Sequence, residues 1–118
     1  GEVMPISCDQ VSSPTWVRDL APALVRLSAH RPSGIFHLTG EGHVSRDDFA
    51  RAALEASGLD PGLVRGVENY PSPARRPHYS ALTNTRARAL SIRLPSWEDS
   101  VRDYVTSIGA ASLDETVA

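Results

Sequence analysis

Two long segments of the chain, residues 15–29 and 96–108, carry apolar side chains at every third or fourth position. This spacing places the apolar residues on one face of an α-helix, so each segment is predicted to form an amphipathic helix. The apolar positions are Trp16, Leu20, Leu24 and Leu27 in the first segment and Trp97, Val101, Tyr104, Val105 and Ile108 in the second. Pro22 lies within the first segment, and because proline lacks the amide hydrogen that a helix interior uses, we expect that helix to start late or to kink.

Capping signals predict two further helices. Ser45 precedes Asp48 by three positions, which is an acidic variant of the capping box, and Gly58 is typical of a residue that follows the last turn of a helix. A helix is therefore expected between them, and a shorter one over residues 83–90. The residues expected near the cap of the shorter helix are Thr83 and Asn84.

Three short segments, residues 3–7, 35–38 and 64–68, are predicted to be strands because they are apolar and lie between turn-forming residues. Pro5 favours an edge position for the first strand, since proline cannot donate to a sheet ladder. The first two strands and the helix between them predict a β-α-β unit, for which a right-handed parallel crossover is strongly favoured.

The order of these elements predicts an α/β fold, an α+β-like small domain with short, mainly parallel strands and three to four helices. A length of 118 residues with 41% hydrophobic residues suits one globular domain. We expect residues 1–108 to form this domain and residues 109–118 to form a flexible tail, because the apolar periodicity ends near Gly109.

Charge and cysteine content exclude several classes of function. A net charge of −2 argues against nucleic acid as a partner, because phosphate backbones are bound by clustered positive charge. The single Cys8 excludes an intrachain disulfide and cysteine-based metal motifs. No apolar run approaches the length of a membrane span and no signal-peptide pattern is visible, so no membrane partner and a cytoplasmic location are expected.

The loop over residues 9–15 is the first candidate binding segment. It lies where a strand runs into a helix, and in a parallel α/β arrangement this position is a natural anion-binding site. Gln10, Pro14 and Thr15 are the candidate ligand contacts. The alternative is purely local: Asp9 and Ser13 satisfy turn backbone, and Ser13 or Thr15 caps the helix.

The loop over residues 71–80 is the second candidate. Its three prolines restrict the backbone, and the adjacent Arg75 and Arg76 are suited to a diphosphate through paired charge-assisted hydrogen bonds. His78 follows them as a further candidate ligand contact. In the alternative interpretation the loop is a stiff connector whose arginines pair with nearby acidic residues.

The remaining histidines and glycines favour structural roles. His37 lies in a predicted strand and is expected to be a core residue bonded to backbone. His37, Glu41 and His43 match no established pattern of metal ligands, so no metal site is expected. Gly40 and Gly42 lack the third glycine of a dinucleotide-binding fingerprint and predict a turn.

Taken in order along the chain, several of these segments resemble the C-terminal, substrate-binding part of dTDP-4-dehydrorhamnose reductases, which are extended short-chain dehydrogenases/reductases. The resemblance covers residues 3–105. Its segments are Asp9-Gln10 with Pro14-Thr15, Gly34-Ile35-Phe36-His37-Leu38, Asp48-Phe49-Ala50, Pro73-Ala74-Arg75-Arg76-Pro77 with Ser80 and Leu82, and Leu94-Pro95-Ser96-Trp97.

The resemblance implies that an N-terminal Rossmann domain binds NADPH or NADH and supplies a Tyr-x-x-x-Lys pair, while the part seen here closes over a dTDP-sugar. This chain contains no lysine, so it is expected to hold neither catalytic residues nor the cofactor, and to be inactive alone. Its expected partners are the dTDP-sugar and the missing Rossmann domain or another chain. Some members dimerise through a metal held by acidic residues, but Arg18 stands where one of those carboxylates would fall.

The implied function is that of the substrate-binding portion of an enzyme that reduces the C4 ketone of dTDP-4-dehydro-L-rhamnose to dTDP-L-rhamnose with NAD(P)H. By the same resemblance, Gln10, Pro14, Arg75 and Arg76 face the nucleotide-sugar or support its cleft. The alternative is a stand-alone nucleotide-sugar-binding or protein-interaction module without redox activity. The sequence leaves open whether the chain is a fragment or a natural stand-alone protein.

Overall fold

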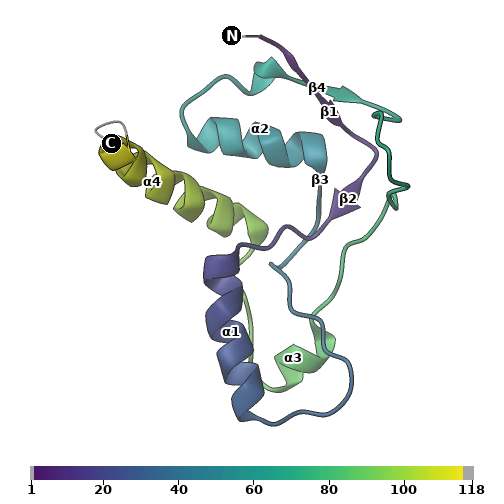
Figure 1. Ribbon diagram of the computed structural model, residues 1–118, viewed down its shortest axis with the longest axis vertical. Coiled ribbons are helices and arrows are strands. Elements are labelled where there is room, and N and C mark those ends of the chain that lie inside the picture. Colours follow the sequence, from purple (N-terminus) through teal and green to yellow (C-terminus); the bar gives the residue numbers. More distant parts are fainter. Residues whose placement is uncertain (1, 116–118) are drawn as a thin grey trace.

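The computed structural model describes residues 2–115, with side chains for residues 2–109. Figure 1 shows β1, β4 and α2 at one end of an elongated molecule, α1 and α3 at the other, and α4 projecting from the region between them. The mixed α/β architecture with short, mainly parallel strands is therefore confirmed. The elements are β1 Met4–Ser7, β2 Val11–Ser12, α1 Val17–Ala29, β3 Val44–Ser45, α2 Arg46–Ala56, a 3₁₀ turn Pro61–Leu63, β4 Val64–Val67, α3 Thr85–Ala89 and α4 Trp97–Glu115.

The parallel pair of the fold is β1 with β4, in a register that aligns Met4 with Val64 and Ser7 with Val67. β4 agrees with the predicted third strand. Among the described residues no other strand pairs with β1, so Pro5 lies at an edge, as its missing amide hydrogen requires. α2 packs against this pair, and the connection between the two parallel strands contains β2, α1, β3 and α2.

The predicted strand over residues 35–38 is wrong, and with it the predicted β-α-β unit. This segment is irregular, and Ile35 is 74% exposed. The Ile35 carbonyl is bonded by a side chain instead of a neighbouring strand, because the Arg86 guanidinium donates to Ile35 O at 2.8 Å, and it also donates to Ser33 O at 3.3 Å. His37 is also exposed, so its predicted core role is wrong.

α1 starts at Val17 and continues through Pro22, which lies inside the helix without ending it. Its buried side is formed by Ala23, with Leu20 and Leu27 packed beside it. That side faces α3 and the segment after it, where the largest apolar cluster of the described residues lies. The cluster consists of Ala23, Ala87, Ile92 and Leu94, joined by Leu20, Leu27, Leu38 and Leu90.

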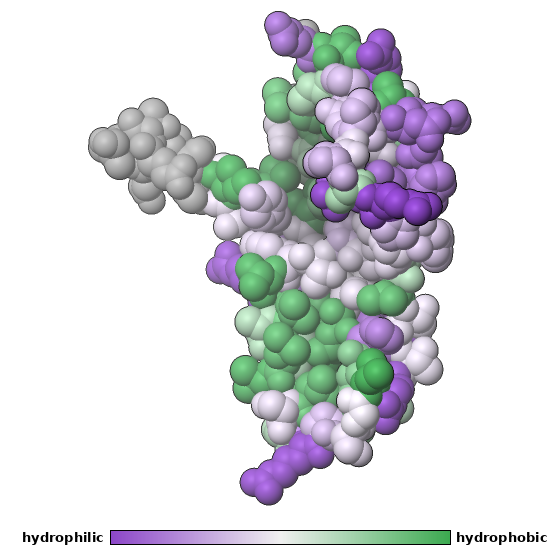
Figure 2. Space-filling view, turned by 45° about the vertical axis from the view of Figure 1, so that its right-hand side comes forward, coloured by the Kyte–Doolittle hydropathy of each residue, from purple (hydrophilic) through white to green (hydrophobic). Residues whose placement is uncertain are grey.

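The outer side of α1 remains apolar and open. Val17 is 70% exposed and Val25 is 69% exposed. Figure 2 shows apolar side chains gathered over the lower half of the molecule, the part that α1 and α3 form. This half therefore has an apolar surface in addition to an apolar interior.

α2 begins and ends where its capping signals predict. The Ser45 hydroxyl accepts from the Asp48 amide at 3.4 Å, and Gly58 adopts φ +74° just beyond the helix. Burial of Asp47 opposes its ionisation, but hydrogen bonds from Ser45 and Arg51 outweigh this and hold the pKa of the Asp47 carboxyl below its ordinary value. The first turn of α2 is thus fixed by its own side chains.

The Asn84 side chain joins the start of α3 to the segment that contains Thr39. It is 1% exposed, and its Oδ1 accepts from the Thr39 amide at 3.0 Å while its Nδ2 donates to the Thr39 carbonyl at 2.8 Å. Asn84 is the N-cap residue of α3, as predicted, but its side chain makes no capping bond. The amide instead acts as a one-residue strand that pairs with Thr39 across 45 positions of sequence.

α4 remains helical beyond Gly109, where the apolar periodicity ends, and reaches Glu115. The flexible tail over residues 109–118 stays a prediction, and residues 116–118 lie outside the described part of the chain. Within the described residues, no helix combines the length and the apolar character that crossing a membrane requires.

We expect Asn84→Ala to lower the free energy of unfolding by about 2 kcal/mol, because it removes three hydrogen bonds and leaves the half-buried Thr39 backbone without these partners. Urea unfolding followed by circular dichroism measures the change. The neighbouring exposed Thr83 provides a control, and Thr83→Ala should stay within about 0.5 kcal/mol of the parent. Equal effects of the two substitutions would contradict the role given to Asn84.

Candidate functional site

The two candidate loops lie side by side, joined through Val11. The Val11 amide donates to the His78 carbonyl at 2.8 Å, and the Ser80 amide donates to the Val11 carbonyl at 2.9 Å. On its other side Val11 pairs with Ser45 of β3. β2 therefore runs between β3 and the second loop. It brings together Ser45 and Tyr79, which are far apart in the sequence.

Hydroxyl groups of the first loop bond to the backbone of distant segments, whereas the local alternative predicts bonds to the turn itself and a helix cap. The Ser13 hydroxyl donates to the Gly42 carbonyl at 2.8 Å and accepts from the Leu82 amide at 3.1 Å. The Thr15 hydroxyl accepts from the Gly40 amide at 3.0 Å. Neither residue caps α1, whose N-cap residue is Trp16 without a side-chain capping bond. These hydroxyls hold distant segments together.

The turn around Gly40 packs directly on the first loop. A Cβ atom at Gly40 would lie 2.3 Å from the Pro14 carbonyl oxygen, so the position has no room for a side chain. Beyond it, the Glu41 amide donates to the Pro95 carbonyl at 3.0 Å. Gly40 therefore serves close packing between this turn and the first loop.

Asp9 fastens the start of the first loop to the turn after β4. Its carboxylate accepts from the Asn69 amide and from the Ser7 hydroxyl, each at 2.9 Å. These bonds, with a smaller contribution from His78, hold the pKa of the Asp9 carboxyl below its ordinary value. Asp9 is therefore engaged in structure and is not a free base in the cleft.

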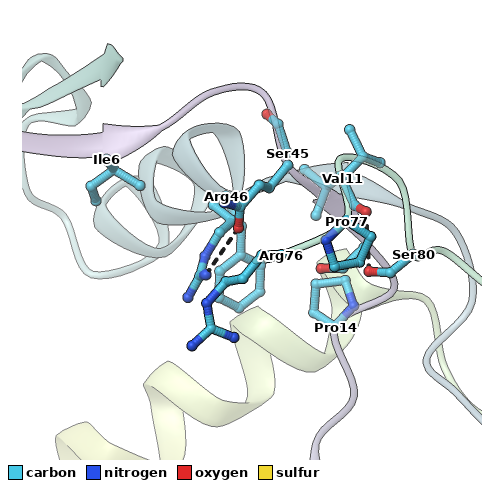
Figure 3. A pocket seen from close by; sticks show the side chains of 12 residues that line it. Ile6, Val11, Pro14, Ser45, Arg46, Arg76, Pro77 and Ser80 are labelled. Carbon is cyan, nitrogen blue, oxygen red and sulfur yellow. Dashed lines mark hydrogen bonds between the residues drawn. The ribbon is translucent and has the colours of Figure 1, made fainter. Parts of the chain in front are cut away.

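A cleft of about 450 Å³ opens between the two loops and the start of α2. It continues into a second hollow of about 410 Å³, and both are lined by Gln10, Arg46 and Arg76. Figure 3 shows the guanidinium groups of Arg46 and Arg76 extending into this space. The lining residues of the first hollow are Ile6, Gln10, Val11, Ser12, Pro14, Val44, Ser45, Arg46, Phe49, Arg76, Pro77 and Ser80.

The charge lining this cleft is positive and is not neutralised by the protein. Among the described residues, neither Arg46 nor Arg76 forms an ion pair with a carboxylate. Arg46 Nη1 donates one hydrogen bond, of 3.3 Å, to the neutral Oε1 of Gln10. Such a cleft is suited to an anionic ligand.

The structure separates the predicted site residues into groups. Gln10, Pro14 and Arg76 line the main cleft. His78 lines an adjoining polar hollow of about 230 Å³, which Gln10 and Arg76 also border. Thr15 lies away from these, in an apolar hollow described below. Arg75 lines none of the hollows described here.

Arg46 is a candidate contact that the sequence analysis did not identify. It is the first residue of α2, where a positive charge is unfavourable because it lies at the positive end of the helix dipole. A basic residue at such a position, followed by Asp47 and Asp48, departs from the local preference of helices. Departures of this kind mark functional positions, and this one was readable from the predicted helix start.

An apolar hollow of about 180 Å³ adjoins the main cleft at Pro14 and Phe49. The Trp16 and Tyr104 rings meet edge to face at 5.6 Å, and the Phe49 and Trp97 ring centroids are 6.0 Å apart. The two tryptophans therefore join the ends of α1 and α4 and also border open space. The cleft as a whole offers an anion-binding part next to an apolar part.

Metal-ligating side chains are not clustered in the described part of the chain. No group of three or more histidine, cysteine, aspartate or glutamate side chains there is placed to hold a metal ion. No lysine occurs anywhere in the chain, so none of Tyr70, Tyr79 and Tyr104 has a lysine partner within it. The positive and polar lining of the cleft is able to bind a polar ligand.

Comparison with known proteins places nearly the whole chain in one family. The model of the RmlD substrate binding domain family matches residues 1–109. The chain is 39% identical over 113 residues to the dTDP-4-dehydrorhamnose reductase of Mycolicibacterium smegmatis, covering 92% of this chain and 35% of that protein. It is 36% identical over 104 residues to the spore coat polysaccharide biosynthesis protein SpsK of Bacillus subtilis, covering 87% of this chain and 36% of that protein.

Solved structures agree with the sequence comparison. The dTDP-4-dehydrorhamnose reductase of Bacillus anthracis, solved in complex with NADP, superposes with a TM-score of 0.83 at 25% identity, over 91% of this chain and 39% of that one. The Clostridium acetobutylicum reductase gives a TM-score of 0.81 at 29% identity, over 92% of this chain and 39% of that one. The chain thus spans well under half the length of the relatives it matches.

Stability should depend on pH through Asp9. Because its folded-state pKa is lowered, its contribution is present above the unfolded-state pKa of about 4 and is lost as the pH falls through the folded-state value. Asp9→Asn should therefore be less stable than the parent at pH 7, with the difference shrinking as the pH falls from about 5 to about 3. Urea unfolding at a series of pH values measures this.

The control for this experiment is Asp103→Asn, which alters an exposed carboxylate in the middle of α4. Its stability should follow that of the parent across the same pH range. A constant difference between Asp9→Asn and the parent from pH 7 to pH 3 would show that the Asp9 charge has no part in the effect.

Proposed function

This chain belongs to the RmlD substrate binding domain family, and we propose that it is the substrate-binding portion of a dTDP-4-dehydrorhamnose reductase-like enzyme. In this proposal the intact enzyme reduces the C4 ketone of dTDP-4-dehydro-L-rhamnose to dTDP-L-rhamnose with NAD(P)H. The present chain binds and orients the nucleotide-sugar. The redox chemistry takes place on a further part of the enzyme, corresponding to the part of the longer relatives that this chain does not match.

One observation supports this function above all: the two loops meet along β2 and open a cleft whose arginine side chains have no acidic partner among the described residues. A nucleoside diphosphate carries negative charge, which these arginine side chains can bind. We assign Gln10, Pro14 and Arg76 to direct ligand contact, and His78 to the adjoining polar hollow. Thr15 supports the loop, and Arg75 remains a weaker candidate.

The companion part of the enzyme is proposed to supply NADPH or NADH and the Tyr-x-x-x-Lys pair. The relative from Bacillus anthracis was solved in complex with NADP. The exposed apolar side chains on the outer side of α1, Val17 and Val25 among them, offer surface for this companion to pack on. A cytoplasmic location belongs to the same proposal. No observation in the described residues favours the alternative of a stand-alone module.

Titration of the chain with dTDP at low ionic strength should give saturable binding heat, and Arg76→Ala should weaken that binding about tenfold by removing a charge-assisted contact. Arg75→Ala should have a smaller effect, since Arg75 lines no described hollow. The control is Arg65→Ala, an exposed arginine of β4 outside the cleft, which should bind as the parent does. No binding heat at millimolar dTDP would contradict the proposed function.

The chain alone should not oxidise NADPH in the presence of a dTDP-4-keto-6-deoxy sugar, because it has no lysine and no dinucleotide-binding loop. Absorbance of NADPH followed over time measures this. A full-length relative from the same family serves as the positive control in the same cuvette conditions. A steady fall in absorbance with the purified chain alone would overturn the division of labour proposed here.

A further inference from the structure

The structure points to Arg46 as the second arm of a diphosphate clamp whose first arm is Arg76. We infer that the two guanidinium groups, one from each side of β2, together hold the two phosphates of the ligand. The adjacent pair Arg75 and Arg76, which the sequence suggests, would then not be the working pair. The inference rests on the proposed function for one point, that the ligand carries a nucleoside. The binding of two linked phosphates is inferred from the cleft itself.

Both arms are positioned by the same strand. The Arg46 amide donates to the Gln10 carbonyl at 3.1 Å, which places the first turn of α2 against the start of β2. Arg76 comes shortly before the segment that pairs with the other side of Val11. The two side chains come from segments on opposite sides of β2 and line the same two hollows, and Figure 3 shows their guanidinium groups extending in the same direction.

The acidic residues near Arg46 are committed elsewhere. Asp47 and Asp48 follow it directly, but both carboxylates pair with Arg51, at 2.7 Å and 2.9 Å. Neither lines the cleft, whose first two hollows contain no acidic residue. The positive charge of Arg46 therefore remains available to a ligand, even though two carboxylates are its neighbours in sequence.

The Gln10 side chain acts as a positioning group for Arg46. Its Oε1 accepts from Arg46 Nη1 at 3.3 Å, a long bond to a neutral acceptor. A phosphate oxygen is a stronger acceptor for a guanidinium than an amide oxygen is, so a phosphate that enters the cleft can take over this contact. Gln10 thus keeps the arm directed into the cleft while no ligand is bound.

A two-armed arrangement predicts a preference among anions. Each guanidinium presents a planar fork that suits one phosphate group, so two forks on opposite sides suit two linked phosphates. Removing one arm should reduce binding of a diphosphate more than binding of a monophosphate. The preference for two phosphates over one is therefore the quantity that tests the clamp.

The experiment is a calorimetric titration of the 118-residue chain with inorganic pyrophosphate, inorganic phosphate, dTDP and dTMP at low ionic strength. We expect the parent to prefer pyrophosphate to phosphate and dTDP to dTMP. Arg46→Ala should weaken pyrophosphate and dTDP binding about tenfold and reduce both preferences. Arg46→Lys, which keeps the charge without the fork, should fall between the parent and Arg46→Ala. The control Arg65→Ala should leave both preferences unchanged.

The outcomes separate the clamp from the proposed function. If the parent shows no preference for pyrophosphate, or if Arg46→Ala keeps that preference, the clamp is wrong, whether or not dTDP binds. If pyrophosphate binding depends on Arg46 but dTDP binds no more tightly than pyrophosphate, the clamp stands and the nucleotide-sugar function fails. Far-ultraviolet circular dichroism checks that each variant is folded, and Arg46→Lys repeats the test with a smaller change.

Discussion

The backbone of Val11 is the point on which the binding cleft depends. It pairs with β3 on one side and with the segment around Tyr79 on the other, and these two pairings help to bring the start of α2 and the proline-containing loop to the same place. A strand of two residues has little stability of its own. Its partners are held in turn by other contacts, so the cleft depends on cooperation among several weakly structured segments.

Those other contacts are hydrogen bonds from side chains to distant backbone groups. Ser13 joins the first loop to Gly42 and Leu82, and Asn84 pairs with Thr39 in the manner of a strand. Each such bond contributes only about 1 kcal/mol, but leaving a buried partner unpaired costs more than that, which makes the set specific. Because this domain has so little sheet, hydrogen bonds from polar side chains connect distant segments that hydrogen bonds between strands would connect in a larger sheet. Polar residues in its loops are therefore poor indicators of function when taken singly.

The sequence predicted the elements that depend on local rules. The helices follow from apolar spacing and capping, and β1 and β4 follow from short apolar runs. The segment over residues 35–38 has the composition of a strand, but the Ile35 carbonyl accepts from Arg86, and a non-local contact of this kind leaves no periodic trace. The same reason explains the site. Gln10 and Arg76 stood in recognisable loops, whereas Arg46 was marked only by an unfavourable charge at a helix start, and its place in the cleft depends on β2.

The absence of lysine from the chain agrees with a division of labour between binding and chemistry. Arginine stays protonated at any pH an enzyme encounters, so it holds phosphate firmly but cannot serve as a proton donor in a reaction. The groups that line the main cleft are arginine, amide and hydroxyl groups together with apolar and proline side chains. None of these is suited to general acid-base catalysis near neutral pH without an activating partner. A surface built in this way suits the charged end of a ligand, and this lining is the physical basis for our proposal that reduction takes place outside these residues.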